Sequence, residues 1–510
     1  MKILTPLLLT ALALPAAAEL KLSKLFSDHM VIQRDLPIRI WGWDHAGQTV
    51  TASFSGSSAS TTATGENGRW ELTLPARPAS AEPATLTISG SSETSVNDIL
   101  VGEVWLCSGQ SNMRFPMAKS TGADLDLLVE NHPAIRLLKL PNVASQQPLD
   151  DFNASWTPAT DTTAIADFSA VGYYYGRILE ENLGVPVGLI DNSWGGSAAE
   201  AWLRRDVFDA DPRNSEQIDY WRKIETTIPQ REAAHQKRLA SFHAEKQAAE
   251  QAGKRFTRKA PKGPQAMLNS QRRPGNLYGG MLRPLIGYGI RGVIWYQGEA
   301  NSSRAGNYAT LFPSMINHWR AEWNQGDFPF YWAQLADYQA ESPQPPALQD
   351  AKWAALRDAQ TATLSLPHTG QAVIITSGET NDIHPTDKLT VARRLARHAL
   401  NKTYGFDQLV CESPRYQSHK AENGKITVTF ETFGSKLDTA DVHHVVGFAI
   451  AGDDLNWKWA KGKLKGKNQV EVSNPDIPNP VHVRYAWANN PVCNLQNPEG
   501  LPATPFRTDK

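Results

Sequence analysis

A serine and a histidine, each following a strongly apolar run, are the residues of this sequence best placed to do chemistry. Ser111 follows "VWLC" in the segment "GQSNM", and His384 follows "AVIIT" in the segment "NDIHPTDK". If both apolar runs are parallel strands, the two side chains lie at the carboxyl end of one sheet, where open α/β sheets place their ligand sites. A histidine there can activate a serine as a nucleophile. Taken alone, a serine after a strand is more often an ordinary turn residue.

Two carboxylates compete to orient His384. Pro385 keeps His384 out of the helical region, so the chain is extended there and residues two apart point to the same side. Asp382 can therefore accept a hydrogen bond from Nδ1 of the ring, which leaves Nε2 free to take a proton from a serine. Glu379, across the turn at 378–381, is the alternative acid.

Three loops that follow predicted strands offer donors for a developing oxyanion. The candidates are the backbone N–H of Ser111, the backbone N–H of Gly196 in "DNSWGGSAAEAW" and the side-chain amide of Gln297 in "WYQGEAN". Acyl transfer needs such groups aimed at the point where negative charge grows. Glu299 and Asn301, in the last of these segments, are further candidates for an acid or for residues of the pocket.

A metal site is a weaker interpretation of the same residues. The sequence contains no HExxH motif, and no third ligand stands at a diagnostic spacing from Asp382 and His384. We therefore expect chemistry without a metal.

Hydrophobic patterns divide the chain into three parts that must position these residues. Residues 19–98 and 406–510 alternate apolar and polar residues, which predicts an N-terminal and a C-terminal β-domain. Residues 99–405 contain continuous apolar runs between helical stretches, which predicts an α/β domain with a buried parallel sheet. Within it, a charged, Ala-rich segment at 230–255 predicts an exposed helix in an insertion of about 206–274.

Composition limits the partners of the chain. The formal net charge of -1 provides no field that would attract nucleic acid or an anionic membrane. The 16 tryptophans suit a protein that handles sugars, because their rings stack on sugar faces and still donate hydrogen bonds. Nothing in the composition defines an oligomeric state.

The first 18 residues predict secretion. They contain one lysine, an apolar stretch of about a dozen residues and three alanines at 16–18, a pattern typical of a signal peptide cleaved after Ala18. We therefore expect a secreted or periplasmic protein. In an oxidising compartment Cys411 and Cys493 are candidates for a disulfide, which would leave Cys107 free.

The segments "GQSNM", "WGGS", "WYQGEAN" and "NDIHPTDK", in this order, resemble the conserved blocks of the SGNH hydrolases and in particular of the sialate O-acetylesterase family of carbohydrate esterases. Both flanking regions, "LFSDHMVIQRDLPIRIWGW" and "VRYAWANNPVCNLQNPEGLPATPFRTD", are similar to that family as well. The resemblance implies a three-layer α/β/α domain with a parallel sheet and a serine esterase that removes acetyl groups from sugars through an acetyl-enzyme, without a cofactor. It implies Ser111 as nucleophile, His384 as base, Asp382 as acid, and Gly196 and Gln297 at the oxyanion positions.

Several alternatives stay open. The acetylated sugar is a sialic acid, as the family name implies, or a plant polymer such as xylan or xyloglucan, and a sialate pocket would need an arginine, for which Arg114, Arg204 and Arg283 are candidates. An α/β-hydrolase lipase or esterase is disfavoured, because Met113 stands where its Gly-x-Ser-x-Gly elbow needs glycine. A sugar-binding protein on an inactive hydrolase scaffold is the non-enzymatic alternative. The short helical insertion is not expected to add a sugar-binding surface.

Overall fold

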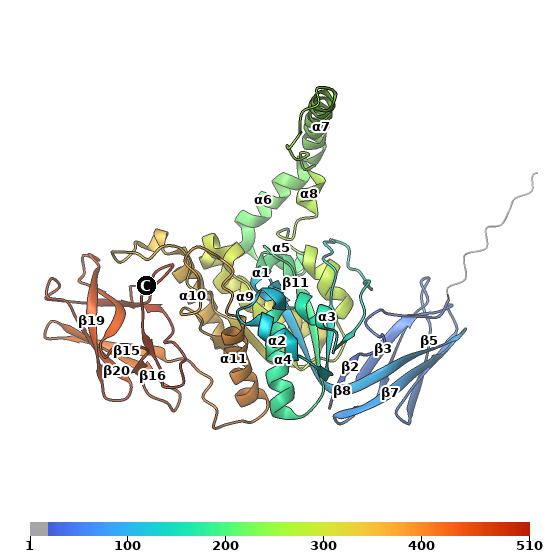
Figure 1. Ribbon diagram of the computed structural model, residues 1–510, viewed down its shortest axis with the longest axis horizontal. Helices are drawn as coiled ribbons and strands as arrows, with labels where there is room; N and C mark the ends of the chain where they lie inside the picture. Colours follow the sequence, from blue (N-terminus) through green and yellow to red (C-terminus); the bar gives the residue numbers. More distant parts are fainter. Residues whose placement is uncertain (1–18, 510) are drawn as a thin grey trace, which may run out of the picture.

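The computed structural model describes residues 19–509 (Figure 1). The predicted signal peptide, residues 1–18, lies outside the described residues. The chain forms several sheets, with a mixed α/β region between N-terminal and C-terminal groups of strands. Within 19–509, no helix has both the length and the apolar character that crossing a membrane requires.

The N-terminal strands bury one face, as their alternating sequence predicts. In β4 (Thr49–Phe54) and β6 (Arg69–Leu74) every second residue is buried, including Phe54 and Trp70. The other strands here are β1 (Lys21–Leu22), β2 (Val31–Gln33), β3 (Ile38–Trp43), β5 (Ser57–Thr62) and β7 (Ser80–Ser89). Strands β1, β3 and β6 form a small sheet, while β2 and β7 pair with β8 (Glu93–Gly109).

Strand β8 is the structural link between the N-terminal strands and the central region. It is 17 residues long, and its first half pairs with β7 while its second half lies between β11 and β12. The boundary that we predict at residues 98 and 99 therefore falls inside one continuous strand.

The central strands follow the order β10-β9-β11-β8-β12-β13-β14. Their bounds are β9 (His132–Lys139), β10 (Thr157–Ala159), β11 (Val187–Ser193), β12 (Gly292–Tyr296), β13 (Phe330–Ala333) and β14 (Thr369–Ala372). The pairings from β9 to β14 are parallel, whereas β10 is antiparallel to β9. The predicted parallel strands therefore form the central part of a larger mixed sheet, which also continues into antiparallel N-terminal strands.

Both faces of β8 are buried, which explains its continuous apolar run. Val104 and Leu106 belong to one hydrophobic cluster, with residues of α9 (Ala305–Trp323) and α10 (Lys352–Ala362). Trp105 and Cys107 point the other way, into a second cluster with residues of α4 (Ala170–Leu183) and α11 (Lys388–His398). Two shorter helices, α2 (Ala123–Val129) and α3 (Thr162–Asp167), lie close to α4 (Figure 1).

One strand prediction is displaced. The apolar run 372–376 predicts a strand, but β14 ends at Ala372. Val373 and Ile375 are buried instead in the hydrophobic cluster of the C-terminal strands. An apolar segment that leaves the sheet and is buried in another hydrophobic core has the same composition as a buried strand. The sequence pattern therefore does not distinguish such a segment from a strand.

The predicted exposed helix is confirmed as α7 (Ile228–Gln251). With α6 (Ser215–Thr226) and α8 (Gln265–Leu268), it forms an arm that projects from the rest of the molecule, and α5 (Arg205–Ala210) lies below the arm, at the edge of the central region (Figure 1). The helix ends before the predicted residue 255, because Gly253 adopts a left-handed conformation with φ of 65° that terminates it.

The C-terminal strands form a seven-stranded sheet in the order β15-β16-β20-β19-β18-β21-β23, with β17 and β22 paired separately. Their bounds are β15 (Arg415–Glu422), β16 (Lys425–Glu431), β17 (Asp438–Thr439), β18 (Val445–Ala451), β19 (Lys458–Lys465), β20 (Gln469–Ser473), β21 (His482–Tyr485), β22 (Leu495–Gln496) and β23 (Phe506–Arg507).

The candidate disulfide between Cys411 and Cys493 is not formed in the structure. All three cysteines are free thiols. Cys411 donates to Oδ1 of Asn401 at 3.5 Å, whereas Cys493 packs against Gly447 at the start of β18. Both cysteines lie in the C-terminal part of the sequence, but their positions in the sequence do not show which residues their side chains contact.

His398, at the end of α11, should make the fold sensitive to acid. Its fully buried ring stacks on Tyr331, and burial lowers its pKa from 6.5 to about 4. The unfolded chain therefore binds a proton below pH 6.5 that the folded chain refuses until about pH 4, so stability falls as pH falls through this window. We expect His398→Phe to remove part of this loss, measured as Tm against pH.

The exposed His443 provides the control. His443→Phe should keep the wild-type dependence of Tm on pH. An identical dependence in wild type and His398→Phe would show that this histidine does not contribute to the acid sensitivity.

Candidate active site

Ser111 is presented by a turn that only glycine can make. Gly109, the last residue of β8, has φ of 138°, and a Cβ there would lie 2.2 Å from the carbonyl oxygen of Tyr296 in β12. The turn is held from both sides, because Gln110 donates to Tyr296 and Trp194 donates to Gly109. Ser111 then begins the short helix α1 (Ser111–Arg114) at the carboxyl end of β8.

The structure brings Ser111, His384 and Asp382 together. Nε2 of His384 lies 2.8 Å from Oγ of Ser111, and Nδ1 lies 3.3 Å from Oδ1 of Asp382. The same carboxylate oxygen accepts the backbone N–H of His384 at 2.9 Å, which fixes the short segment between the two residues. The side chains of His384 and Asp382 are 37% and 58% exposed, so the site is open to solvent.

Glu379, the alternative acid, is directed elsewhere. Its Oε1 accepts the backbone N–H of Thr386 at 2.7 Å and the hydroxyl of Thr386 at 2.9 Å. The carboxylate therefore closes the loop that carries His384 without contacting the ring. Of the two acids, only Asp382 has a carboxylate oxygen near Nδ1 in this structure.

The glycine turn after β11 lies directly beside the serine. Gly196 has φ of 73°, and a Cβ on Gly195 would lie 3.5 Å from Cβ of Ser111. The backbone of this turn therefore borders the space around the hydroxyl, where predicted oxyanion donors belong. Its carbonyl groups face the other way and accept hydrogen bonds from Gln271 and Arg272.

The predicted role of Gln297 as an oxyanion donor needs correction. Its side chain is fully buried, and Nε2 uses its hydrogens on the carbonyl of Ser197 at 3.1 Å and on Oδ1 of Asn301 at 2.7 Å. Its Oε1 accepts the hydroxyl of Tyr308 at 3.0 Å. Every polar atom of this amide is engaged within the protein, so no N–H is left for a substrate.

Asn301 is a structural residue of the same network. Its Oδ1 accepts the backbone N–H of Ala199 at 3.0 Å, and its Nδ2 donates to Glu200 at 2.8 Å. Glu200 also binds Arg304 at 2.7 Å. These contacts join the loop after β11 to the 3-10 helix η6 (Glu299–Arg304), so Asn301 holds the site together and does not face the serine.

Two residues that sequence reasoning missed, Asn112 and Lys388, lie immediately behind the site. Nδ2 of Asn112 donates to Glu299 at 2.5 Å and to the carbonyl of Ile383 at 3.0 Å, and its Oδ1 accepts Nζ of Lys388 at 2.6 Å. Both residues stand inside the segments that contain Ser111 and His384. The sequence offered one signal for Lys388, which is the first residue of the helix α11 and directly follows the segment that carries His384.

Burial shifts the pKa values of the two charged groups in this network in opposite directions. It lowers the pKa of Lys388 to about 7, and it raises the pKa of Glu299. One oxygen of Glu299, Oε2, is buried without a hydrogen-bond partner. Glu299 is linked through Asn112 to α1, the helix that begins at Ser111.

Each of the three arginines predicted as candidates for binding a carboxylate has a partner within the protein. Arg114 donates to the carbonyl of Ser193 at 3.0 Å and also binds Asn142. Arg204 binds Asp206 and Glu322, at 2.7 and 2.6 Å. Arg283 lies 3.6 Å from Asp150. These arginines tie elements of the fold together.

Comparisons with known proteins agree on one class of enzyme. Residues 259–401 match the family model described as carbohydrate esterase, sialic acid-specific acetylesterase. The sialate O-acetylesterase of Mus musculus is 25% identical, over 98% of this chain and 96% of its own length, and that of Rattus norvegicus is 28% identical, over 76% and 74%. The crystal structure of a carbohydrate acetylesterase from Xanthomonas citri is 33% identical and covers 96% of this chain and 100% of its own, with a TM-score of 0.81.

The structural role of Gln297 can be measured. Gln297→Ala removes three buried hydrogen bonds, and with them one partner each of Ser197, Asn301 and Tyr308, so we expect it to lower the free energy of unfolding by about 2 kcal/mol or more. Thermal unfolding should show a fall in Tm of several degrees. Ser302→Ala on the nearby 3-10 helix η6, where the hydroxyl donates to the backbone carbonyl of Glu299 at 3.0 Å, should change Tm little. An unchanged Tm in Gln297→Ala would contradict this role.

Proposed function

The chain belongs to the sialate O-acetylesterase family of carbohydrate esterases and is a carbohydrate O-acetylesterase, and from this premise we propose that it hydrolyses acetyl esters of glycans with Ser111, His384 and Asp382 as catalytic triad. The observation that supports the proposal most strongly is the 2.8 Å contact between Nε2 of His384 and Oγ of Ser111. A hydroxyl bonded to a histidine at the open end of a sheet is the arrangement that acyl transfer requires.

The proposed reaction has two steps. Oγ of Ser111 attacks the acetyl carbonyl carbon while Nε2 of His384 accepts the hydroxyl proton, and the same proton then passes to the departing sugar hydroxyl. This leaves an acetyl group on Ser111. In the second step Nε2 of His384 accepts a proton from a water whose oxygen attacks the acetyl carbonyl carbon. The bond between that carbon and Oγ of Ser111 then breaks, Nε2 returns the proton to Oγ, and acetic acid is released. The exposure of the site gives both the sugar and the water access.

Asp382 has the role of stabilising the charged form of His384. Its Oδ1 lies near Nδ1 and also accepts the backbone N–H of His384, so the carboxylate both holds the ring orientation and faces its positive charge. We propose the backbone N–H groups of Ser111 and Gly196 as oxyanion donors, because the glycine turn lies against the serine.

The proposal extends to the architecture and the location of the protein. The two hydrophobic clusters on opposite faces of β8 favour an SGNH-type three-layer domain. The pattern of residues 1–18 favours a signal peptide and a secreted or periplasmic enzyme. A sialic acid is one acetylated substrate and an acetylated xylan or xyloglucan is the alternative.

Replacing the nucleophile should abolish activity without unfolding the protein. We expect Ser111→Ala to lower kcat on an aryl acetate by a factor of about a thousand or more, because loss of a triad nucleophile costs several orders of magnitude. Thermal unfolding should stay close to wild type, since the lost hydroxyl lies at a solvent-open strand end. Retention of more than about a hundredth of the wild-type kcat would contradict the assignment.

The two acids near His384 can be separated by kinetics. Asp382→Asn removes the charge beside Nδ1, so we expect kcat to fall by a factor of about a thousand or more. Glu379→Gln keeps the acceptor for Thr386 and should cost about tenfold or less. Both variants would be measured on one acetyl ester. The opposite order of effects would assign the acid to Glu379.

A further inference from the structure

An open cleft of about 730 Å³ lies between the helical arm and the loops beside Ser111. One wall consists of residues from α6, α7 and the loop before α8, and the opposite wall includes Glu200, Ala300 and Arg304. We call this space the insertion cleft. Its volume is within the range of about 300–1,000 Å³ that is typical of small-molecule sites.

The insertion cleft adjoins the catalytic serine. Arg272, which lines the cleft, donates to the carbonyl of Gly196 at 3.2 Å, and its neighbour Gln271 donates to the carbonyl of Gly195 at 3.2 Å. The opposite side of that glycine turn packs against Ser111. When the acetyl group of a glycan lies at Ser111, its other sugar rings can therefore extend past the glycine turn into the insertion cleft.

The lining of the cleft carries an excess of positive charge. Arg231, Arg238, Lys262 and Arg272 line it, and within residues 19–509 none of these four has a carboxylate as an ion-pair partner. On the acidic side, Glu200 is paired with Arg304, which leaves Glu216. In a chain whose formal net charge is -1, this local excess favours an anionic ligand.

An aromatic side chain is available in the same cleft. Tyr220 is 53% exposed, and its ring meets that of Trp221 edge to face at 5.5 Å. A ring held in this way offers a free flat face with a polar hydroxyl at its end, which suits stacking on a sugar.

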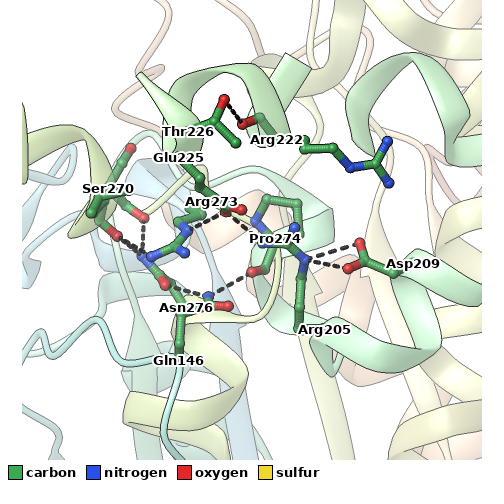
Figure 2. A network of polar contacts seen from close by, with 11 residues as sticks. Gln146, Arg205, Asp209, Arg222, Glu225, Thr226, Ser270, Arg273, Pro274 and Asn276 are labelled. Atoms are coloured by element: carbon green, nitrogen blue, oxygen red, sulfur yellow. Dashed lines mark hydrogen bonds and ion pairs between the residues drawn. The ribbon is translucent and has the colours of Figure 1, made fainter. Parts of the chain in front are cut away.

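The arm that forms the cleft wall is fixed at its base. Glu225, near the end of α6, accepts from Arg205 at 2.8 Å and from Arg273 at 2.9 Å, and these two arginines stand at the start and the end of the insertion (Figure 2). Asn276 adds two hydrogen bonds of 2.8 Å to the carbonyls of Leu268 and Ser270. The two ends of the arm are thus joined through one carboxylate, which keeps the cleft wall in place.

We propose that the insertion cleft binds a carboxylate-bearing part of the glycan whose acetyl ester lies at Ser111. The inference rests on the proposed function and adds a site to it, in a segment that the sequence does not mark as a sugar-binding surface. Arginine pairs with a carboxylate through two parallel hydrogen bonds, and an exposed tyrosine beside it fixes the adjoining ring. The arm selects the substrate and takes no part in the chemistry.

The test compares acidic glycans with neutral counterparts. The substrates are an O-acetylated glucuronoxylan oligosaccharide and an O-acetylated sialyllactose, each paired with a derivative in which the carboxylate is converted to an amide. We expect wild type to show a KM at least tenfold lower for one or both acidic glycans than for the amides, with similar kcat. The variant Arg231→Gln/Arg238→Gln/Lys262→Gln should lose that difference, and Tyr220→Ala should raise KM for both members of a pair.

Two controls separate the possible failures. Lys237→Gln, on the exposed part of α7 outside the cleft lining, should behave as wild type, and turnover of an aryl acetate should be the same in all these variants. Equal KM values within each pair, or no turnover of either acidic glycan, would overturn the inference while leaving the esterase intact. If wild type itself does not turn over an aryl acetate, the proposed function is wrong.

Discussion

The geometry of the site depends on the hydrogen bonds of one side chain, the amide of Asn112. One buried amide accepts from Lys388 and donates to Glu299 and to the carbonyl of Ile383. Burying an ammonium and a carboxylate costs free energy unless both are hydrogen-bonded, so this amide must stay where both groups reach it. Because Asn112 follows Ser111 and Ile383 precedes His384, the same requirement sets the position of Ser111 relative to His384.

The central sheet supplies the surroundings that this amide needs. Parallel pairing of β8 with β11 and β12 brings three strand ends to one edge, and the missing side chain at Gly109 lets the serine turn approach β12. The buried pair of Gln297 and Asn301 then joins the loops that follow β11 and β12. The side chains of His384 and Asp382 remain exposed, whereas the polar groups behind them are buried, so water weakens the interactions that position them only a little.

Sequence patterns predicted the parts of this arrangement that depend on local rules. Alternation predicted the buried faces of β4 and β6, and the proline after His384 predicted the extended segment that sets Asp382 beside the ring. The error at Gln297 arose because a strand end defines where a residue lies but not whether its side chain turns inward. Asn112 and Lys388 were missed because their importance comes from contacts between segments more than 270 residues apart.

The insertion cleft also depends on contacts between segments that are distant in the sequence, so the sequence alone does not indicate it. Its basic residues are unremarkable on a charged helix, and the sequence of the arm indicates only a solvated surface. They become a site because Glu225 joins the two ends of the arm and sets its inner face toward the glycine turn beside Ser111. The core of such a fold is constrained by the buried groups behind the serine, whereas an arm that contacts only the loops is free to change. Substrate selection should therefore differ between relatives mainly where arms of this kind differ, while the contact between Ser111 and His384 is kept.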